Sequence, residues 1–74
     1  MNEQTFGQKA VGLSFNPSSS NEVDSIKLKV AELIDELHTK REYTTNDEVN
    51  RMLSIAITEL QSAQMWAVKA VTWK

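Results

Sequence analysis

The chain has 74 residues, with 10 acidic and 8 basic side chains, one histidine and no cysteine. The missing cysteines exclude disulfides and thiolate zinc sites, and a single histidine excludes a histidine-rich metal site. The formal net charge of −2 argues against binding along a nucleic-acid backbone, and no apolar run reaches the roughly 18 residues that a membrane span needs.

Residues 1–19 are expected to form an irregular or partly extended arm and loop. Gly7 and Gly12 interrupt this segment, and its apolar side chains are unevenly spaced. Pro17 disfavours a helical conformation in the residue before it, and the serines that follow are typical of turns and caps. The first residues lack the apolar segment of a signal peptide, so they do not predict export.

Residues 20–74 are expected to fold as an antiparallel two-helix hairpin, which makes the fold class all-α. Each helix is preceded by a Ser/Thr-x-x-Glu capping box, the pattern in which two side chains satisfy free backbone amides at a helix start. The two boxes, Ser19 with Glu22 and Thr45 with Glu48, predict helices over about 20–41 and about 46–73.

The second predicted helix carries more apolar surface than one partner helix covers. Its main stripe has the 3.5-residue period of a coiled coil and contains Val49, Leu53, Ala56, Leu60, Ala63, Ala67 and Ala70. The first helix has a matching stripe, Val23, Ile26, Val30, Leu33 and Leu37. Because a small chain without disulfides needs another stabiliser, the surplus predicts a homo-oligomer. The expected interface residues are Leu60, Ala63, Trp66, Ala67, Ala70 and Trp73.

No catalytic motif is evident in the sequence. There is no glycine-rich phosphate loop, no His-Glu-x-x-His and no nucleophile elbow. The adjacent carboxylates Asp35–Glu36 and Asp47–Glu48 point about 100° apart on a helix, so neither pair forms an acid–base dyad. We therefore expect a non-enzyme that needs no cofactor and no metal.

Two groups of residues are candidates for binding a nucleotide. The first group, Phe15, Asn16, Lys27 and Lys29, combines an aromatic ring for stacking with an amide and ammonium donors near a helix start. Alternatively, Phe15 packs over Val23 as a hydrophobic staple and the lysines form a solvated flank. The second group, Arg51, Ser54 and Thr58, shares one side of the second helix, where an arginine could bind a phosphate. An exposed polar face explains the second group equally well.

Two stretches of the sequence resemble small phage anti-CBASS proteins that sequester cyclic nucleotides. The first is Leu13-Ser14-Phe15-Asn16-Pro17, followed by Ile26-Lys27 and Ala31. The second is Ser54-Ile55-Ala56-Ile57-Thr58-Glu59-Leu60, followed by Ala63-Gln64-Met65-Trp66-Ala67. The same helical-hairpin domain is found in a phage sponge for the Thoeris defence signal. The likeness covers most of the chain from Leu13 onward, and the first dozen residues are most similar to T-even-type phage members.

The resemblance implies a compact homohexamer that holds cyclic dinucleotides at one kind of subunit interface and cyclic trinucleotides at another, without cutting them. By position, Phe15 would stack on a base, where the family more often has tyrosine, and Asn16 would contact base or phosphate. One of Lys27 and Lys29 would pair with phosphate. The trinucleotide pocket would contain Arg51, Ser54 and Thr58.

The biological role implied by the resemblance is immune evasion by a phage in the cytoplasm of its bacterial host. Signals such as cGAMP would be held back, so that CBASS effectors are not activated. The expected partners are therefore cyclic di- and trinucleotides and other copies of the chain, with no long nucleic acid and no membrane. A different hypothesis is a non-enzymatic helical adaptor that docks a host or phage protein through Trp66 and Trp73.

Overall fold

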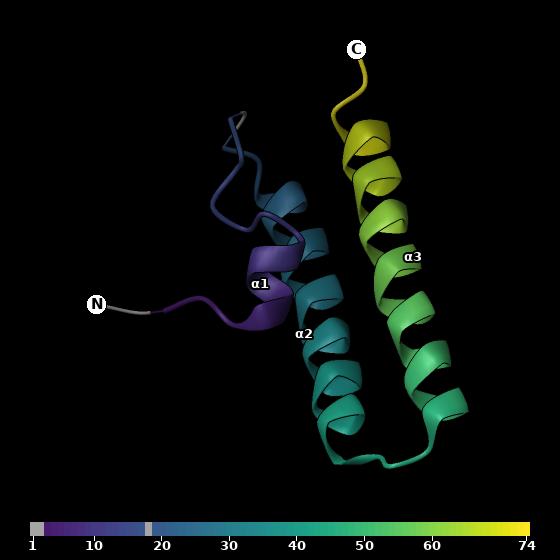
Figure 1. The fold of residues 1–74 in the computed structure, drawn as a ribbon. Coiled ribbons are helices and arrows are strands. Elements are labelled where there is room, and N and C mark those ends of the chain that lie inside the picture. Colours follow the sequence, from purple (N-terminus) through teal and green to yellow (C-terminus); the bar gives the residue numbers. More distant parts are fainter. Residues whose placement is uncertain (1–2, 18) are drawn as a thin grey trace.

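The computed structural model describes residues 3–17 and 19–74, so residues 1, 2 and 18 of the expected arm lie outside the described residues. This part of the chain forms three helices, α1 (Phe6–Ala10), α2 (Asn21–Tyr43) and α3 (Asp47–Val71). α2 and α3 lie side by side and antiparallel, and α1 lies against α2 (Figure 1). The all-α hairpin is therefore confirmed. No helix in the described ranges is long and apolar enough to cross a membrane.

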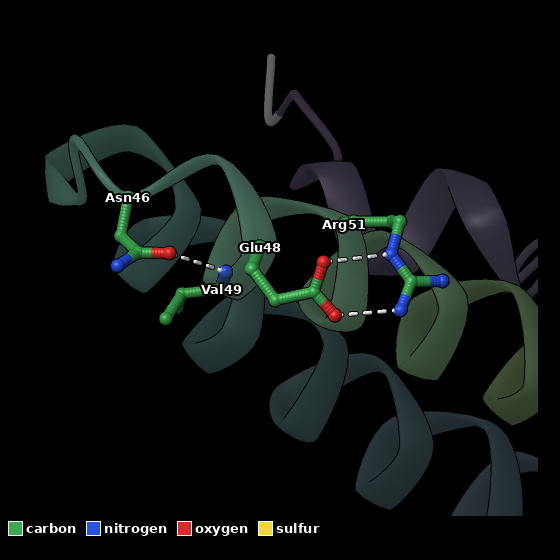
Figure 2. Close-up of polar contacts among 4 residues, drawn as sticks. All are labelled: Asn46, Glu48, Val49 and Arg51. Carbon is green, nitrogen blue, oxygen red and sulfur yellow. Dashed lines mark hydrogen bonds and ion pairs between the residues drawn. The ribbon is translucent and has the colours of Figure 1, made fainter.

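Polar side chains cap the starts of both long helices. Ser20 Oγ accepts a hydrogen bond from the backbone N–H of Val23 at 3.3 Å. The side-chain oxygen of Asn46 accepts from the backbone N–H of Val49 at 3.0 Å (Figure 2). Each cap is one residue later than the Ser or Thr of the expected capping box. The two predicted capping boxes were therefore wrong. The side-chain oxygen of the next residue, Ser20 or Asn46, accepts the hydrogen bond from the third backbone amide of the helix instead.

The N-terminal arm is not irregular throughout, because it contains α1. Thr5 Oγ1 accepts from the N–H of Gln8 at 3.1 Å, and Gln8 Oε1 accepts from the N–H of Thr5 at 3.0 Å, which is a complete capping box. After the helix, Gly12 has φ 64°, and the N–H groups of Gly12 and Leu13 donate to the carbonyls of Lys9 and Gln8. These two bonds form the Schellman motif, which ends α1 and turns the chain.

α1 is held against α2 by a close approach of Gly7 to the α2 backbone. A Cβ at Gly7 would lie 2.1 Å from the carbonyl oxygen of Ala31, so only glycine fits at this distance. The N–H of Gly7 donates to Asp35 Oδ1 at 2.7 Å. This contact places the turn after α1 beside the start of α2.

The hydrophobic core lies where all three helices meet, and it contains Val11, Ala31, Ile34 and Ile57. The buried stripe of α2 is turned from the expected one, because Lys27 and Ala31 are buried whereas Leu33 is 43% exposed. On α3, Ile57 and Gln64 are buried, whereas Ala63 and Ala70 of the expected stripe are exposed. The physical reason is that α2 packs against α1 as well as α3, so its buried stripe faces between these two neighbours.

Candidate functional site

The open end of the hairpin, where α2 begins and α3 ends, carries two hollows that share Phe15, Lys27 and Val68. The wider hollow has a volume of about 430 Å³. The narrower one, of about 260 Å³, adds Asn16, Pro17, Val23 and Thr72 to the shared residues. Small-molecule sites span about 300–1,000 Å³, so only the wider hollow is large enough by itself.

Phe15 stands between the two hollows with most of its ring open to solvent. Its side chain is 72% exposed, so it is not buried over Val23 as a hydrophobic staple would be. The ammonium of Lys27 lies 5.6 Å from the centroid of the ring. An exposed aromatic face beside a cation is an arrangement on which a nucleotide base can stack.

Lys27 is the buried cation of this site. Its side chain is only 4% exposed, and its ammonium donates to the backbone carbonyls of Gly12, at 2.9 Å, and of Phe15. An ammonium has three donors, so one N–H remains for another acceptor. Within the described ranges Lys27 forms no ion pair with a carboxylate. A buried charge that lacks a counter-charge favours an anion beside it, and the solvated-flank alternative is wrong for Lys27.

The other two residues of the first group lie differently. Asn16 lines only the narrower hollow, and its Nδ2 donates to Ser20 O and Asp24 Oδ1, both at 2.9 Å. The amide of Asn16 therefore shapes the loop that leads into α2. Lys29 is exposed and lines neither hollow. The structure thus brings Phe15 and Lys27 together, places Asn16 at their edge and leaves Lys29 outside.

The second group of candidate residues shares one shallow hollow on α3. Arg51, Ser54 and Thr58 line it together with Ile55 and Glu59, around a volume of about 400 Å³. Ser54 also ties α3 to α2, because its hydroxyl accepts a hydrogen bond of 3.0 Å from Arg41 Nη1.

Arg51 already has an anionic partner, the carboxylate of Glu48. Figure 2 shows the two parallel hydrogen bonds, from Nε to Oε1 at 3.1 Å and from Nη2 to Oε2 at 2.6 Å. Both side chains are exposed, to 62% and 60%. The hydrogen bonds from Arg51 lower the pKa of the Glu48 carboxyl below its ordinary value of 4.5, and they raise the pKa of Arg51. A phosphate would have to replace this carboxylate.

The Glu48–Arg51 pair predicts a stability difference that depends on pH. Because the pKa of Glu48 is lowered in the folded chain, the pair stabilises the fold above the ordinary pKa of 4.5 and stops doing so as pH falls through the lowered value. Glu48→Gln should therefore unfold at lower urea concentration than wild type at pH 7, and the difference should vanish at strongly acidic pH. Asp47→Asn, which removes a charge from the same helical turn without an arginine partner, should give a smaller difference. Equal shifts for both variants would assign the effect to the helix dipole alone.

Four of the six expected interface residues are exposed, and Trp66 and Trp73 form an exposed strip with Lys69 at the end of α3 and just beyond it. Trp66 and Trp73 are 67% and 73% exposed, and the ammonium of Lys69 lies 5.3 Å and 5.7 Å from their rings. Ala63 and Ala70 are exposed as well, whereas Leu60 and Ala67 are half-buried.

Several residues of the site were not predicted from the sequence. The wider hollow is also lined by Lys9, Gln61, Gln64 and Met65. Lys9 belongs to α1, which had no apolar periodicity to indicate it. Gln64 is 5% exposed, although a glutamine within an amphipathic pattern normally predicts a polar face.

A second cluster that was not predicted lies at the other end of α2. Phe6 stacks on His38 there with ring centroids 4.1 Å apart, and Arg41 lies over the same phenylalanine.

These features define a class, a small helical hairpin domain with a hollow in which a buried ammonium lies beside an exposed aromatic ring. The family model described as the Acb2/Tad1 hairpin domain matches residues 8–72, and the chain belongs to this family. The Acb2/Tad1 family is a phage anti-defence family of cyclic-nucleotide sponges, which confirms the resemblance at the level of the family. No individual curated protein and no solved structure gave a significant match.

Proposed function

We propose that this chain is a sponge that binds cyclic oligonucleotide second messengers reversibly and releases them uncut. The observation that carries the proposal is the buried ammonium of Lys27, which has no carboxylate partner in the described ranges and lies beside the exposed ring of Phe15. A phosphodiester supplies the missing negative charge, and its base stacks on the ring. Membership of the Acb2/Tad1 family supports the same function.

The two candidate hollows fit two classes of ligand. Cyclic dinucleotides such as cGAMP bind at Phe15 and Lys27, with Asn16 holding the loop. Cyclic trinucleotides bind at Arg51, Ser54 and Thr58, where a phosphate displaces Glu48 from the guanidinium. In the cytoplasm of an infected bacterium, this binding keeps the signals from CBASS effectors.

The chain acts as a homo-oligomer, and the family resemblance favours a hexamer. Support comes from the exposed strip with Trp66 and Trp73, because contiguous exposed aromatic surface is typical of interfaces. Binding sites at junctions between copies make ligand binding and assembly mutually stabilising.

Calorimetry with cGAMP and with a cyclic trinucleotide, run alongside light scattering, tests the proposal. We expect saturable binding with a fixed ratio of ligand to assembled particle. After the protein is denatured, the ligand should be recovered intact. Recovery of linear nucleotides would show a phosphodiesterase instead, and a folded monomer that binds neither ligand would contradict the proposal.

Phe15→Ala is expected to weaken the binding of a cyclic dinucleotide by about 1–3 kcal/mol, the range for loss of one base–aromatic stack. The stability of the fold should change little, because the ring is 72% exposed. Phe15→Tyr keeps the aromatic face and should retain the affinity. Calorimetry on the three proteins measures both effects, and unchanged affinity in Phe15→Ala would place the base elsewhere.

One observation favours the adaptor as a second candidate function. The exposed strip with Trp66, Lys69 and Trp73 also has the composition of a protein-docking surface. A pure adaptor should show no thermal shift with any cyclic nucleotide, which separates it from a sponge.

A further inference from the structure

Gln64 carries an amide that no side chain or backbone group within residues 3–17 and 19–74 satisfies. The residue is 5% exposed and lines the wider hollow, yet its side chain makes no hydrogen bond within those ranges. No side-chain nitrogen or oxygen that is fully buried there lacks a partner. The polar atoms of Gln64 are therefore not fully buried, and the hollow that the residue lines is where a ligand can reach them. Gln61, one turn earlier, differs because its Nε2 donates to Ile57 O at 3.4 Å.

The wider hollow thus brings together three groups from three segments. The ring of Phe15 comes from the loop before α2, the ammonium of Lys27 comes from α2, and the free amide of Gln64 comes from α3. The narrower hollow has the amide of Asn16 in place of Gln64, and that amide is already bonded to Ser20 and Asp24. A base stacked on the wider side of Phe15 therefore lies in the hollow that Gln64 lines, and within residues 3–17 and 19–74 the amide of Gln64 makes no hydrogen bond of its own.

We infer that Gln64 recognises adenine in the wider hollow and so makes the site prefer adenine-containing cyclic dinucleotides; this inference rests on the proposed function. A carboxamide presents a donor and an acceptor side by side, which matches the N7 acceptor and N6 donor of adenine. Guanine presents two acceptors on the same edge, O6 and N7, so the carbonyl of Gln64 would face an acceptor. Burial makes that mismatch costly, because a buried polar group without a partner loses its hydration.

The test compares cyclic di-AMP, cyclic di-GMP and the 7-deaza-adenine analogue of cyclic di-AMP by calorimetry. Wild type should bind cyclic di-AMP roughly 5- to 150-fold more tightly than the analogue, the range expected for one amide–adenine pair. Gln64→Met has an unbranched side chain of similar length without hydrogen-bonding groups. It should bind cyclic di-AMP and the analogue equally, and its preference for adenine over guanine should fall by a similar factor. Gln4→Met, the same change at a residue that lines none of the hollows described above, should behave as wild type.

Each outcome decides between the two proposals. Wild-type binding that is the same for cyclic di-AMP and its 7-deaza analogue overturns the role of Gln64 and leaves the sponge function standing. Failure of wild type to bind any of the three ligands overturns the role of Gln64, and failure to bind cGAMP and a cyclic trinucleotide as well overturns both. If Gln64→Met does not fold, as circular dichroism would show, the comparison of ligands on wild type alone still decides whether N7 of adenine is recognised, and equal binding of the two ligands overturns the inference.

Discussion

Gly7→Ala is expected to lower the free energy of unfolding by about 2–4 kcal/mol, through overpacking and the loss of a hydrogen bond to a carboxylate. The added Cβ would lie 2.1 Å from Ala31 O and 2.9 Å from Asp35 Oδ1. Backbone atoms of α2 cannot move aside as a flexible side chain would. α1 must therefore shift away from α2, and the hydrogen bond of 2.7 Å between Gly7 and Asp35 is lost with it.

Gly7→Ala should also weaken ligand binding, because α1 and its turn supply Lys9 and Gly12 to the wider hollow.

Gly12→Ala is the matched control for the effect of Gly7→Ala on stability. It places a side chain at φ 64° with no heavy atom within 4 Å, so only the left-handed conformation is penalised, by about 1–2 kcal/mol. Urea denaturation followed by circular dichroism compares the two variants. If Gly7→Ala costs no more than Gly12→Ala, the close approach of α1 to α2 is not a main stabiliser.

The hairpin could be predicted because its signals are local. Period and length indicated two amphipathic helices, and the polar break between them indicated an antiparallel turn. α1 could not be predicted in this way, since a helix of five residues has no apolar periodicity and depends on the contact between Gly7 and Ala31. The same missing helix explains the misplaced stripe on α2, because a second neighbour changes which face is buried.

The candidate site was predictable in its chemistry and not in its geometry. Phe15 and the lysines were chosen as the aromatic and cationic parts of a nucleotide site. The burial of Lys27 depends on the carbonyls of Gly12 and Phe15, which reach its ammonium only after the Schellman turn has formed. The burial of Gln64 could not be predicted for a related reason, because a hydrophobic pattern assigns glutamine to the surface. By contrast, the ion pair of Glu48 with Arg51 could have been predicted from spacing alone, because residues three apart on a helix are neighbours.

Lys27→Met is expected to weaken the binding of cGAMP by about 2–3 kcal/mol, or roughly 30- to 150-fold, because a hydrogen bond from a buried ammonium to a phosphate is lost. Methionine fills much of the same space, but the carbonyls of Gly12 and Phe15 lose their shared donor. Some loss of stability accompanies the substitution, so affinity must be measured well below the thermal transition of the variant.

Lys29→Met provides the control, and it also decides which lysine meets the phosphate. Lys29 is exposed and lines neither hollow, so its replacement should change affinity by no more than about 0.5 kcal/mol. Both variants lose one positive charge, and the two positions are two residues apart on α2. The long-range attraction of an anionic ligand therefore falls by a similar amount in both, and the difference between them reports the local contact. A larger loss of affinity in Lys29→Met would indicate that the phosphate binds on the outer flank of α2. The buried ammonium of Lys27 would then only stabilise the turn after α1.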